Sequence, residues 1–152
     1  MMNEVGRREL LEFLAHHDTL ALSTKGTGEF PEVAPVFFAA GEDLLLYFVS
    51  SRESSHSRNA ARDERVAGAV YRDGQERAIL QGLQLWGCCT AVPDQELEAA
   101  RKIYLKKFPF IQQKPFLLKL FHDQQLYQLR PCKVRLIDNA RGFGHKKEWV
   151  LD

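Results

Sequence analysis

A hydroxyl-rich segment in the first half of the chain has the residue types that bind phosphate. It reads Ser50-Ser51-Arg52-Glu53-Ser54-Ser55-His56-Ser57-Arg58-Asn59 and leads into a short predicted helix over residues 54–62. Backbone N–H groups at a helix N-terminus lack partners within the helix, and the helix dipole is positive there. With Ser54 as the N-cap, hydroxyl and N–H groups would surround phosphate oxygens, and His56 or Arg58 would supply positive charge. The alternative is a serine-rich turn that caps a helix and binds nothing.

Two strands are predicted immediately before this segment. Residues 33–40 are apolar at odd and even positions, which predicts a strand covered on both faces. The connection Gly41-Glu42-Asp43 joins it to residues 44–49 as an antiparallel hairpin. Because Pro35 has no N–H group, we expect it at an edge or a bulge, where backbone groups of Val36 or Phe37 become available to a ligand with an amide-like edge. The alternative is an edge strand protected against aggregation.

A later strand, predicted over residues 78–92, carries a second candidate contact surface. Alternation places Leu83 and Leu85 on one face, and Gln84 and Trp86 on the other. An amide beside an indole suits an aromatic, hydrogen-bonding ligand or a subunit interface. A half-exposed strand face that binds nothing is the alternative.

The remaining pattern predicts a mainly β fold. Further helices are expected from an Asn3 cap to about His17, from an Asp94 cap through Lys107, and after Pro115; further strands are expected at 19–24, 66–71, 126–129, 133–137 and 146–151. Six or more strands with hairpin connections and a few helices indicate a small antiparallel β-barrel with peripheral helices. We expect a single domain over residues 1–152.

Composition and charge exclude several classes of function. The chain has 152 residues and a formal net charge of +1, so no concentrated basic face is available for nucleic acid. No apolar stretch approaches the ~20 residues that span a bilayer, and the first residues lack the apolar core of a signal peptide. Three cysteines, two of them adjacent, make no disulfide framework. We therefore expect a cytoplasmic protein with reduced thiols and no membrane partner.

Metal and hydrolytic chemistry find no support in the sequence. The five histidines show no metal-ligand spacing and there is no Cys-x-x-Cys, so we predict no metal site. No serine has the surroundings of a nucleophile elbow, and no catalytic residue can be identified. The segment Gly142-Phe143-Gly144-His145-Lys146 is interpreted as a loop that allows close backbone approach, or simply as a turn before the last strand.

Several of these motifs, in this order, resemble the pyridoxamine 5'-phosphate oxidase-like FMN-binding split barrels. The resemblance is carried by Val33-Ala34-Pro35-Val36-Phe37-Phe38, the hairpin, Ser54-Ser55-His56-Ser57-Arg58-Asn59, Arg65-Val66-Ala67 and Gln81-Gly82-Leu83-Gln84-Leu85-Trp86-Gly87. The C-terminal Asp138-Asn139-Ala140-Arg141-Gly142-Phe143-Gly144-His145-Lys146 with Trp149 resembles an uncharacterised bacterial branch of that superfamily. The likeness spans roughly residues 5–151.

The resemblance implies a six-stranded antiparallel split barrel that forms a homodimer with two FMN sites at its interface. By position, Pro35, Val36 and Phe37 would run along the isoalloxazine ring, and Ser50, Ser51, Ser54, Ser55 and His56 would hold the ribityl phosphate. Gln84 and Trp86 would reach the flavin from the partner subunit, and Lys146 and Trp149 would close the site. One departure stands out, because the oxidases carry Arg-Lys where this chain has Ser55-His56. A C-terminal arginine set for pyridoxamine 5'-phosphate is also missing, so vitamin B6 synthesis is not predicted.

Three functions remain open at this point. The first is an FMN-dependent oxidoreductase that moves electrons or hydride to a small, unidentified substrate. The second is haem binding, which some relatives with this barrel perform, with His16, His17 or His145 as an axial ligand. The third is a non-catalytic binding or stress-response module.

Overall fold

Six antiparallel strands close into a barrel, and a seventh extends its edge. The computed structural model describes residues 2–152, within which the sheet runs in the order β3-β2-β1-β4-β5-β6-β7. β3 also pairs with β6, from Leu46 opposite Leu129 to Ser50 opposite Gln125, and this pairing closes the barrel. The strands are β1 (Thr19–Thr24), β2 (Glu32–Ala40), β3 (Leu46–Ser50), β4 (Arg65–Tyr71), β5 (Gln81–Ala91), β6 (Gln125–Asp138) and β7 (Lys146–Val150). The predicted antiparallel barrel is confirmed.

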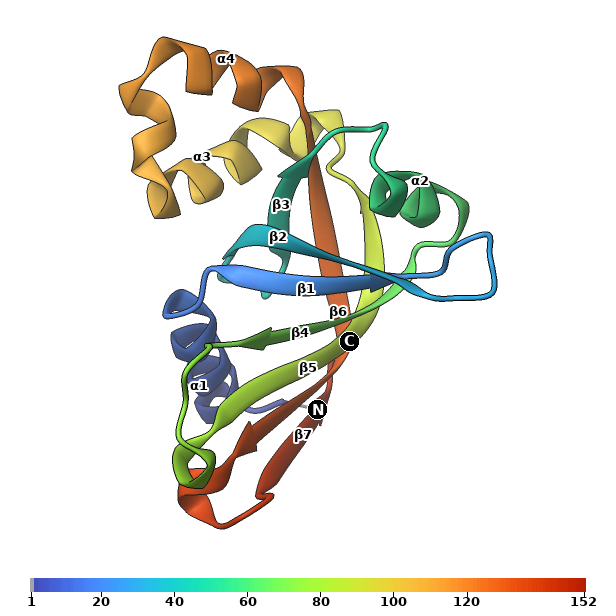
Figure 1. Ribbon diagram of the computed structural model, residues 1–152. Coiled ribbons are helices and arrows are strands. Elements are labelled where there is room, and N and C mark those ends of the chain that lie inside the picture. Colours follow the sequence, from blue (N-terminus) through green and yellow to red (C-terminus); the bar gives the residue numbers. More distant parts are fainter. Residues whose placement is uncertain (1) are drawn as a thin grey trace.

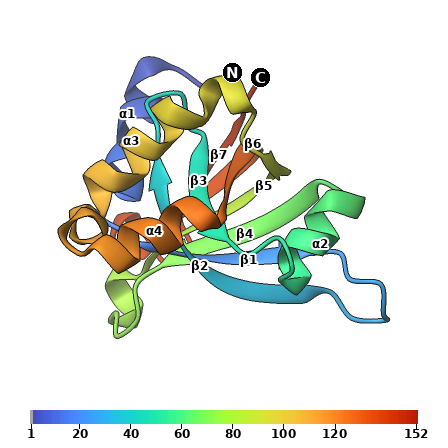
Figure 2. The same cartoon turned by 90° about the horizontal axis from the view of Figure 1, so that it is seen from above.

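Four α-helices lie around the barrel. They are α1 (Glu4–Ala15), α2 (Ser55–Arg62), α3 (Leu97–Lys107) and α4 (Pro115–Asp123), and short 3-10 turns connect several elements. Figures 1 and 2 show α3 and α4 together on one side of the molecule and α2 on the other, beside the projecting turn between β1 and β2. Asn3 caps α1 as predicted, because its side chain accepts a hydrogen bond from the Gly6 N–H.

Two apolar clusters hold these layers together. Inward-facing side chains such as Phe38, Phe48 and Leu129 fill the barrel. Their outward-facing neighbours at one end of the sheet, including Ala39 and Tyr47, pack under α3 and α4 in a second cluster. This arrangement follows from the period of two along each strand, which sends successive residues to opposite faces.

The cover over β2 is less complete than its sequence predicted. Helix α3 covers only the end of β2, around Ala39. Earlier in the strand, Val33 is 70% exposed and Phe37 is 63% exposed. The prediction of a strand covered on both faces is therefore wrong for β2 up to Phe37 within a single chain.

One continuous strand replaces the two closing strands that were predicted at 126–129 and 133–137. β6 runs through Pro131 because the β5–β6 ladder is irregular there, with a register shift between Trp86 and Gly87. A bulge can accommodate a residue that has no N–H to donate. The helix predicted from Asp94 also differs, since a 3-10 turn at Asp94–Glu96 precedes α3.

Lys107 joins α3 to the end of α1, a contact between residues far apart in sequence. Its Nζ donates to the carbonyl oxygens of Leu14, at 3.4 Å, and His17, and lies 4.1 Å from the centre of the Phe38 ring. The carbonyls at a helix C-terminus lack partners within the helix, and a cation there also suits the helix dipole.

We expect Lys107→Met to lower the free energy of unfolding by about 2 kcal/mol, because it leaves part-buried carbonyls without their charged donor. Urea denaturation measures this effect. The matched control is Lys106→Met, which changes an exposed neighbour on the same helix and is expected to shift stability by less than about 0.5 kcal/mol. Equal midpoints for the two variants would contradict the assigned role of Lys107.

Candidate functional site

Ser50, Ser54 and His56 meet at the N-terminus of α2 and form what we call the serine cluster. Ser50 Oγ lies 2.7 Å from His56 Nε2 and 3.2 Å from Ser54 Oγ. Ser54 is the N-cap, as predicted, and its Oγ accepts a hydrogen bond from the Ser57 N–H at 3.3 Å. The Ser54 hydroxyl also donates to the Ser51 carbonyl oxygen at 2.9 Å. The cluster therefore holds the start of α2 in a defined geometry.

Two backbone N–H groups remain available at this helix start. Ser54 N–H donates to the Ser51 carbonyl oxygen, and Arg58 N–H donates to that of Ser54. Within residues 2–152, the N–H groups of Ser55 and His56 have no such partner. Unpartnered N–H groups at a helix N-terminus attract anions. The serine cluster thus has donors that can meet phosphate oxygens.

The positive charge near the cluster is limited. Burial lowers the pKa of His56 below its ordinary value, and the nearby Glu32 carboxylate opposes this shift. At neutral pH the imidazole is therefore mostly uncharged. Arg58 is paired with Glu53 at 2.5 Å, so its charge is already compensated. The site depends on hydrogen-bond donors more than on fixed cations.

β2 has a free edge from Glu32 to Phe37, beside α2. β3 pairs with β2 only from Phe38 to Ala40, whereas β1 pairs with it from Glu32 to Phe37. Phe38 N–H donates to the Asp18 carbonyl oxygen at 2.9 Å, on the β1 side. Because backbone groups alternate in direction along a strand, those of Pro35 and Phe37 point to the open side. The prediction that Pro35 lies at a strand edge is confirmed.

Tyr104 of α3 partly occupies this edge. Its hydroxyl donates to the Phe37 carbonyl oxygen at 3.3 Å, and Phe108 lies edge-on to the Phe37 ring, with centroids 6.1 Å apart. The Phe37 N–H and the Pro35 carbonyl remain on the open side. Val36 points inward and is buried, and its backbone groups face β1, so it offers neither its side chain nor a hydrogen bond to a ligand at the free edge.

Gln84 and Trp86 lie on the outward-facing side of the sheet, which we call the outer face. Along one row of paired residues it runs through Pro35, Ala21, Ala69, Gln84 and Arg135. Small side chains at its centre separate the exposed apolar residues of β2 from the polar residues of β5 and β6. In the sheet order, β1 and β4 separate β5 from β2. A single chain therefore does not bring Gln84 or Trp86 to the serine cluster.

The two predicted residues of β7 face opposite ways. Lys146 is exposed on the outward side. Trp149 packs against α1, where a Cβ atom added to Gly6 would lie 2.9 Å from Trp149 Nε1. Trp149 would have to leave this contact to approach a ligand on the outer face.

Two cationic residues of the outer face were missed by the sequence analysis. Lys133 Nζ and Arg135 Cζ each lie 5.2 Å from the Trp86 ring, and Arg135 also donates to Gln84 Oε1 at 3.1 Å. Their alternate spacing on one strand signals a shared face. The β5–β6 register places Lys133 opposite Trp86 and Arg135 opposite Gln84, and no local pattern reveals that register.

None of the helices within residues 2–152 has both the length and the apolar character needed to cross a bilayer.

Comparison with known proteins gives relatives in sequence and in structure, although no protein-family model matches the chain. The sequence is similar to the UPF0306 protein YhbP of Salmonella paratyphi A, at 24% identity over 148 residues, covering 97% of this chain and 89% of the relative. The structure is similar to a haem-binding protein from Mycobacterium smegmatis, with a TM-score of 0.77 and 20% identity, covering 99% of this chain and 60% of the other. It is also similar to a proposed pyridoxamine 5'-phosphate oxidase from Listeria innocua, with a TM-score of 0.64 and 17% identity, covering 86% and 96% of the two chains. With its closed six-stranded barrel and peripheral helices, this chain has the split-barrel fold.

Proposed function

We propose that this protein is a homodimeric FMN-binding protein that oxidises or reduces a small substrate. The observation that carries the proposal is the free edge of β2 beside a helix N-terminus with unpartnered N–H groups. These two features match the two ends of FMN, a flat ring with an amide-like edge and an anionic phosphate. The structural likeness to a proposed pyridoxamine 5'-phosphate oxidase supports the same assignment.

The free edge of β2 suits the isoalloxazine ring. The Phe37 N–H and the Pro35 carbonyl can meet the donors and acceptors of the pyrimidine edge, whereas the backbone groups of Val36 between them face β1. Tyr104 fixes the Phe37 carbonyl and so keeps this part of the strand in place. Hydrogen bonds from a rigid backbone hold a ligand with little loss of conformational freedom.

The serine cluster suits the phosphate. Ser50 and Ser54 would supply hydroxyl groups, with Ser51 and Ser55 flanking them, and the N–H groups of Ser55 and His56 would point at the phosphate oxygens. The site lacks a fixed positive charge for the phosphate, because His56 is mostly neutral and occupies the position at which the resembling oxidases have lysine. We expect FMN to bind, and to bind more weakly than a site with a fixed cation would allow.

A second copy of the chain would complete the site through the outer face. Val33, Phe37 and Tyr71 expose large apolar side chains there, and the small residues between β2 and β5 allow close approach. In such a dimer, Gln84 of the partner subunit would hydrogen-bond the flavin and Trp86 of the partner subunit would cover it. Lys146, on the same outward side, would lie at the margin.

FMN, when bound, supplies electron or hydride transfer. The residues of this chain would position the ring along β2, hold the phosphate at α2 and exclude water at the interface. No residue of the cluster stands out as a proton donor for a substrate, so the protein's part is binding and orientation.

Replacing His56 by lysine tests the phosphate assignment directly. A lysine at this position places a permanent charge beside the phosphate, so His56→Lys is expected to bind FMN about tenfold more tightly. Quenching of flavin fluorescence measures the affinity. His122→Lys, on the exposed part of α4, is the matched control and is expected to leave affinity unchanged. If His56→Lys binds FMN with unchanged or lower affinity, the phosphate does not lie beside residue 56.

The affinity for FMN should also depend on pH through His56. Its lowered pKa means that the free protein carries a neutral imidazole at neutral pH, and a bound phosphate favours the protonated form. Binding therefore takes up a proton, and affinity should rise as pH falls from about 7.5 to about 6, where the phosphate itself begins to lose charge. The same titration with His56→Lys should be nearly flat over this range. A wild-type affinity that is constant with pH would exclude His56 from the phosphate site.

Haem binding is the second candidate, favoured by the likeness to a haem-binding protein. His16 Nδ1 and His17 Nδ1 lie 2.8 Å and 2.7 Å from carbonyl oxygens of α1. They must donate there, which leaves each Nε2 available as an iron ligand. His145 is less suited, since its Nε2 is buried. A Soret band that appears when haemin is added to the wild type, and that is lost in His16→Ala or His17→Ala, would establish haem binding.

The third hypothesis, a non-catalytic module, predicts a dimer that binds neither FMN nor haem.

A further inference from the structure

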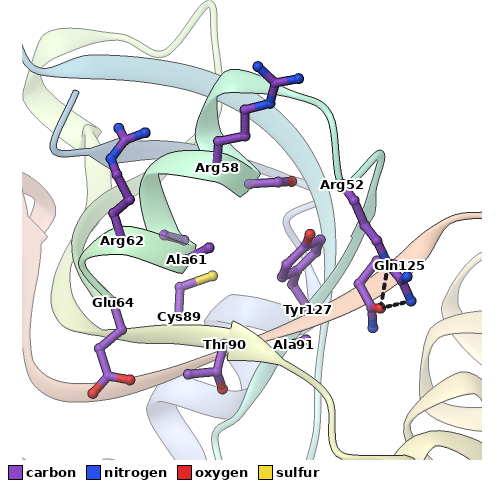
Figure 3. Close-up of a pocket in the computed structure, with 12 residues that line it drawn as sticks. Arg52, Arg58, Ala61, Arg62, Glu64, Cys89, Thr90, Ala91, Gln125 and Tyr127 are labelled. Carbon is purple, nitrogen blue, oxygen red and sulfur yellow. Dashed lines mark hydrogen bonds between the residues drawn. The ribbon is translucent and has the colours of Figure 1, made fainter. Parts of the chain in front are cut away.

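A cavity of about 710 Å³ opens between α2 and the ends of β5 and β6. Figure 3 shows Tyr127 and Cys89 on its inner side, α2 with Arg58 and Arg62 along one border, and Arg52 beside Gln125 at another. None of its lining residues belongs to the proposed FMN site. Its volume is in the range of pockets that hold small organic ligands.

The inner surface of this cavity is apolar. Ala60, the Tyr127 ring and Cys89 are buried on this side, and Ala61 and Ala91 line the cavity at more exposed positions. Cys89 is 1% exposed, and burial raises the pKa of its thiol to about 12. The thiol therefore stays protonated and serves as an apolar contact rather than as a nucleophile. This surface favours the apolar body of a ligand.

The rim carries positive charge that the protein does not neutralise. Arg52 donates to Gln125 Oε1 through Nε at 3.1 Å and through Nη2 at 2.7 Å. Arg62 donates to Asn59 Oδ1 at 2.5 Å. Both acceptors are uncharged amides, and within residues 2–152 neither guanidinium has a carboxylate partner.

The other charged groups of the lining leave this excess in place. Arg58 is paired with Glu53, and Glu64 is the one carboxylate among the residues that line the cavity. Amide acceptors orient the guanidinium groups of Arg52 and Arg62 without cancelling their charge. A guanidinium held in this way can exchange or share its hydrogen bonds with an incoming anion.

We propose that this cavity is a second binding site, which takes a small amphipathic anion: a carboxylate, sulfonate or phosphate carried on an apolar body. The apolar body contacts Tyr127, Cys89 and the alanines, and the anionic group lies at the rim beside Arg52 at one border or Arg62 at the other. Because this site shares no lining residue with the proposed FMN site, saturation of the protein with FMN should not displace the ligand.

Two matched fluorescent probes test the site. 8-Anilinonaphthalene-1-sulfonate has an apolar aromatic body with a sulfonate, and N-phenyl-1-naphthylamine has the same body without it. We expect the sulfonate to bind with one site per chain and about tenfold more tightly than the neutral probe. Equal affinities would overturn the proposal, because the arginines would then contribute nothing.

Substitutions distinguish the contribution of the rim to probe binding from that of the inner surface. The double variant Arg52→Gln/Arg62→Gln should weaken sulfonate binding about tenfold and leave the neutral probe unchanged. Ala61→Phe, at an exposed position of α2 that lines the cavity, should weaken both probes by filling space. The matched controls are Arg77→Gln and Ala99→Phe, at exposed positions outside the cavity, and neither should change binding.

The position at which the probe binds distinguishes the cavity from the remaining alternative, which is adsorption of the probe to exposed apolar side chains elsewhere on the protein. Backbone amide shifts in the heteronuclear NMR spectrum should change in residues 57–62 and 89–91 when the sulfonate is added. Changes confined to α4, where Phe116 and Leu120 are exposed, would overturn the proposal, as would normal binding by the double variant.

Discussion

Gly87→Ala is expected to lower the free energy of unfolding by about 3 kcal/mol. A Cβ atom at this position would lie 2.1 Å from the Arg130 carbonyl oxygen and 2.8 Å from Pro131 Cα. Both are backbone atoms of the neighbouring strand, so no side chain can rotate away to make room. The clash falls at the irregularity that lets β6 run through Pro131, and relieving it means separating β5 from β6.

Gly82→Ala is the matched control, because it adds the same methyl group to the same strand. The nearest atoms to that Cβ are 3.9 Å away, which is ordinary contact. We expect its stability to lie within about 0.5 kcal/mol of the wild type. Urea denaturation of both variants measures the difference, and similar midpoints would mean that the β5–β6 bulge is not as close-packed as described.

Ala69→Arg is expected to convert the proposed homodimer to monomers and to weaken FMN binding at least about a hundredfold. Ala69 lies at the centre of the outer face, between Ala21 of β1 and Gln84 of β5. A long charged side chain there would hold two copies apart, and burying it without a partner would cost several kcal/mol. Because the proposed site takes Gln84 and Trp86 from the partner, loss of the dimer should carry loss of the flavin with it.

Sedimentation equilibrium gives the mass in solution, and flavin fluorescence quenching gives the affinity for FMN. The control is Ala99→Arg, which makes the same change at an exposed position of α3 and should remain dimeric. Circular dichroism establishes that both variants are folded. A folded Ala69→Arg protein that is still dimeric would move the interface elsewhere, and a monomer that binds FMN normally would remove the partner from the site.

Short-range patterns in the sequence predicted much of this fold. The capping roles of Asn3 and Ser54, the hairpin of β2 and β3, and the alternation of Leu83 and Gln84 along β5 each depend on residues a few positions apart. Pro35 indicated a strand edge for a reason that holds in any sheet, because it has no N–H to donate. Such features need no knowledge of the rest of the chain.

Features that depend on distant residues could not be predicted. Pro131 lies within a strand only because Gly87 on the next strand allows the bulge. Lys107 meets the end of α1, and Arg52 meets Gln125, through contacts that span 93 and 73 positions of the sequence. The packing of loops and helices determines these contacts, and the sequence next to Lys107 or Arg52 does not indicate them.

In the candidate site too, contacts between residues close in sequence were predicted and contacts between distant residues were not. Ser50, Ser54 and His56 lie close together in sequence, and the structure brings them within hydrogen-bond reach of one another. Gln84 and Trp86 lie, as expected, on the face of β5 opposite to Leu83 and Leu85, and within one chain β1 and β4 separate β5 from β2. The cavity under α2 was not anticipated, since β5, β6 and the loop before α2 form it together.

Titration of the purified wild-type protein with FMN, followed by flavin fluorescence at about pH 6 and about pH 7.5, is the most direct measurement of the main proposal. Saturation at one FMN per chain, with tighter binding at the lower pH, is the predicted result. A protein that leaves flavin fluorescence unchanged at both pH values, in the wild type and in His56→Lys alike, would show that the start of α2 holds no flavin phosphate.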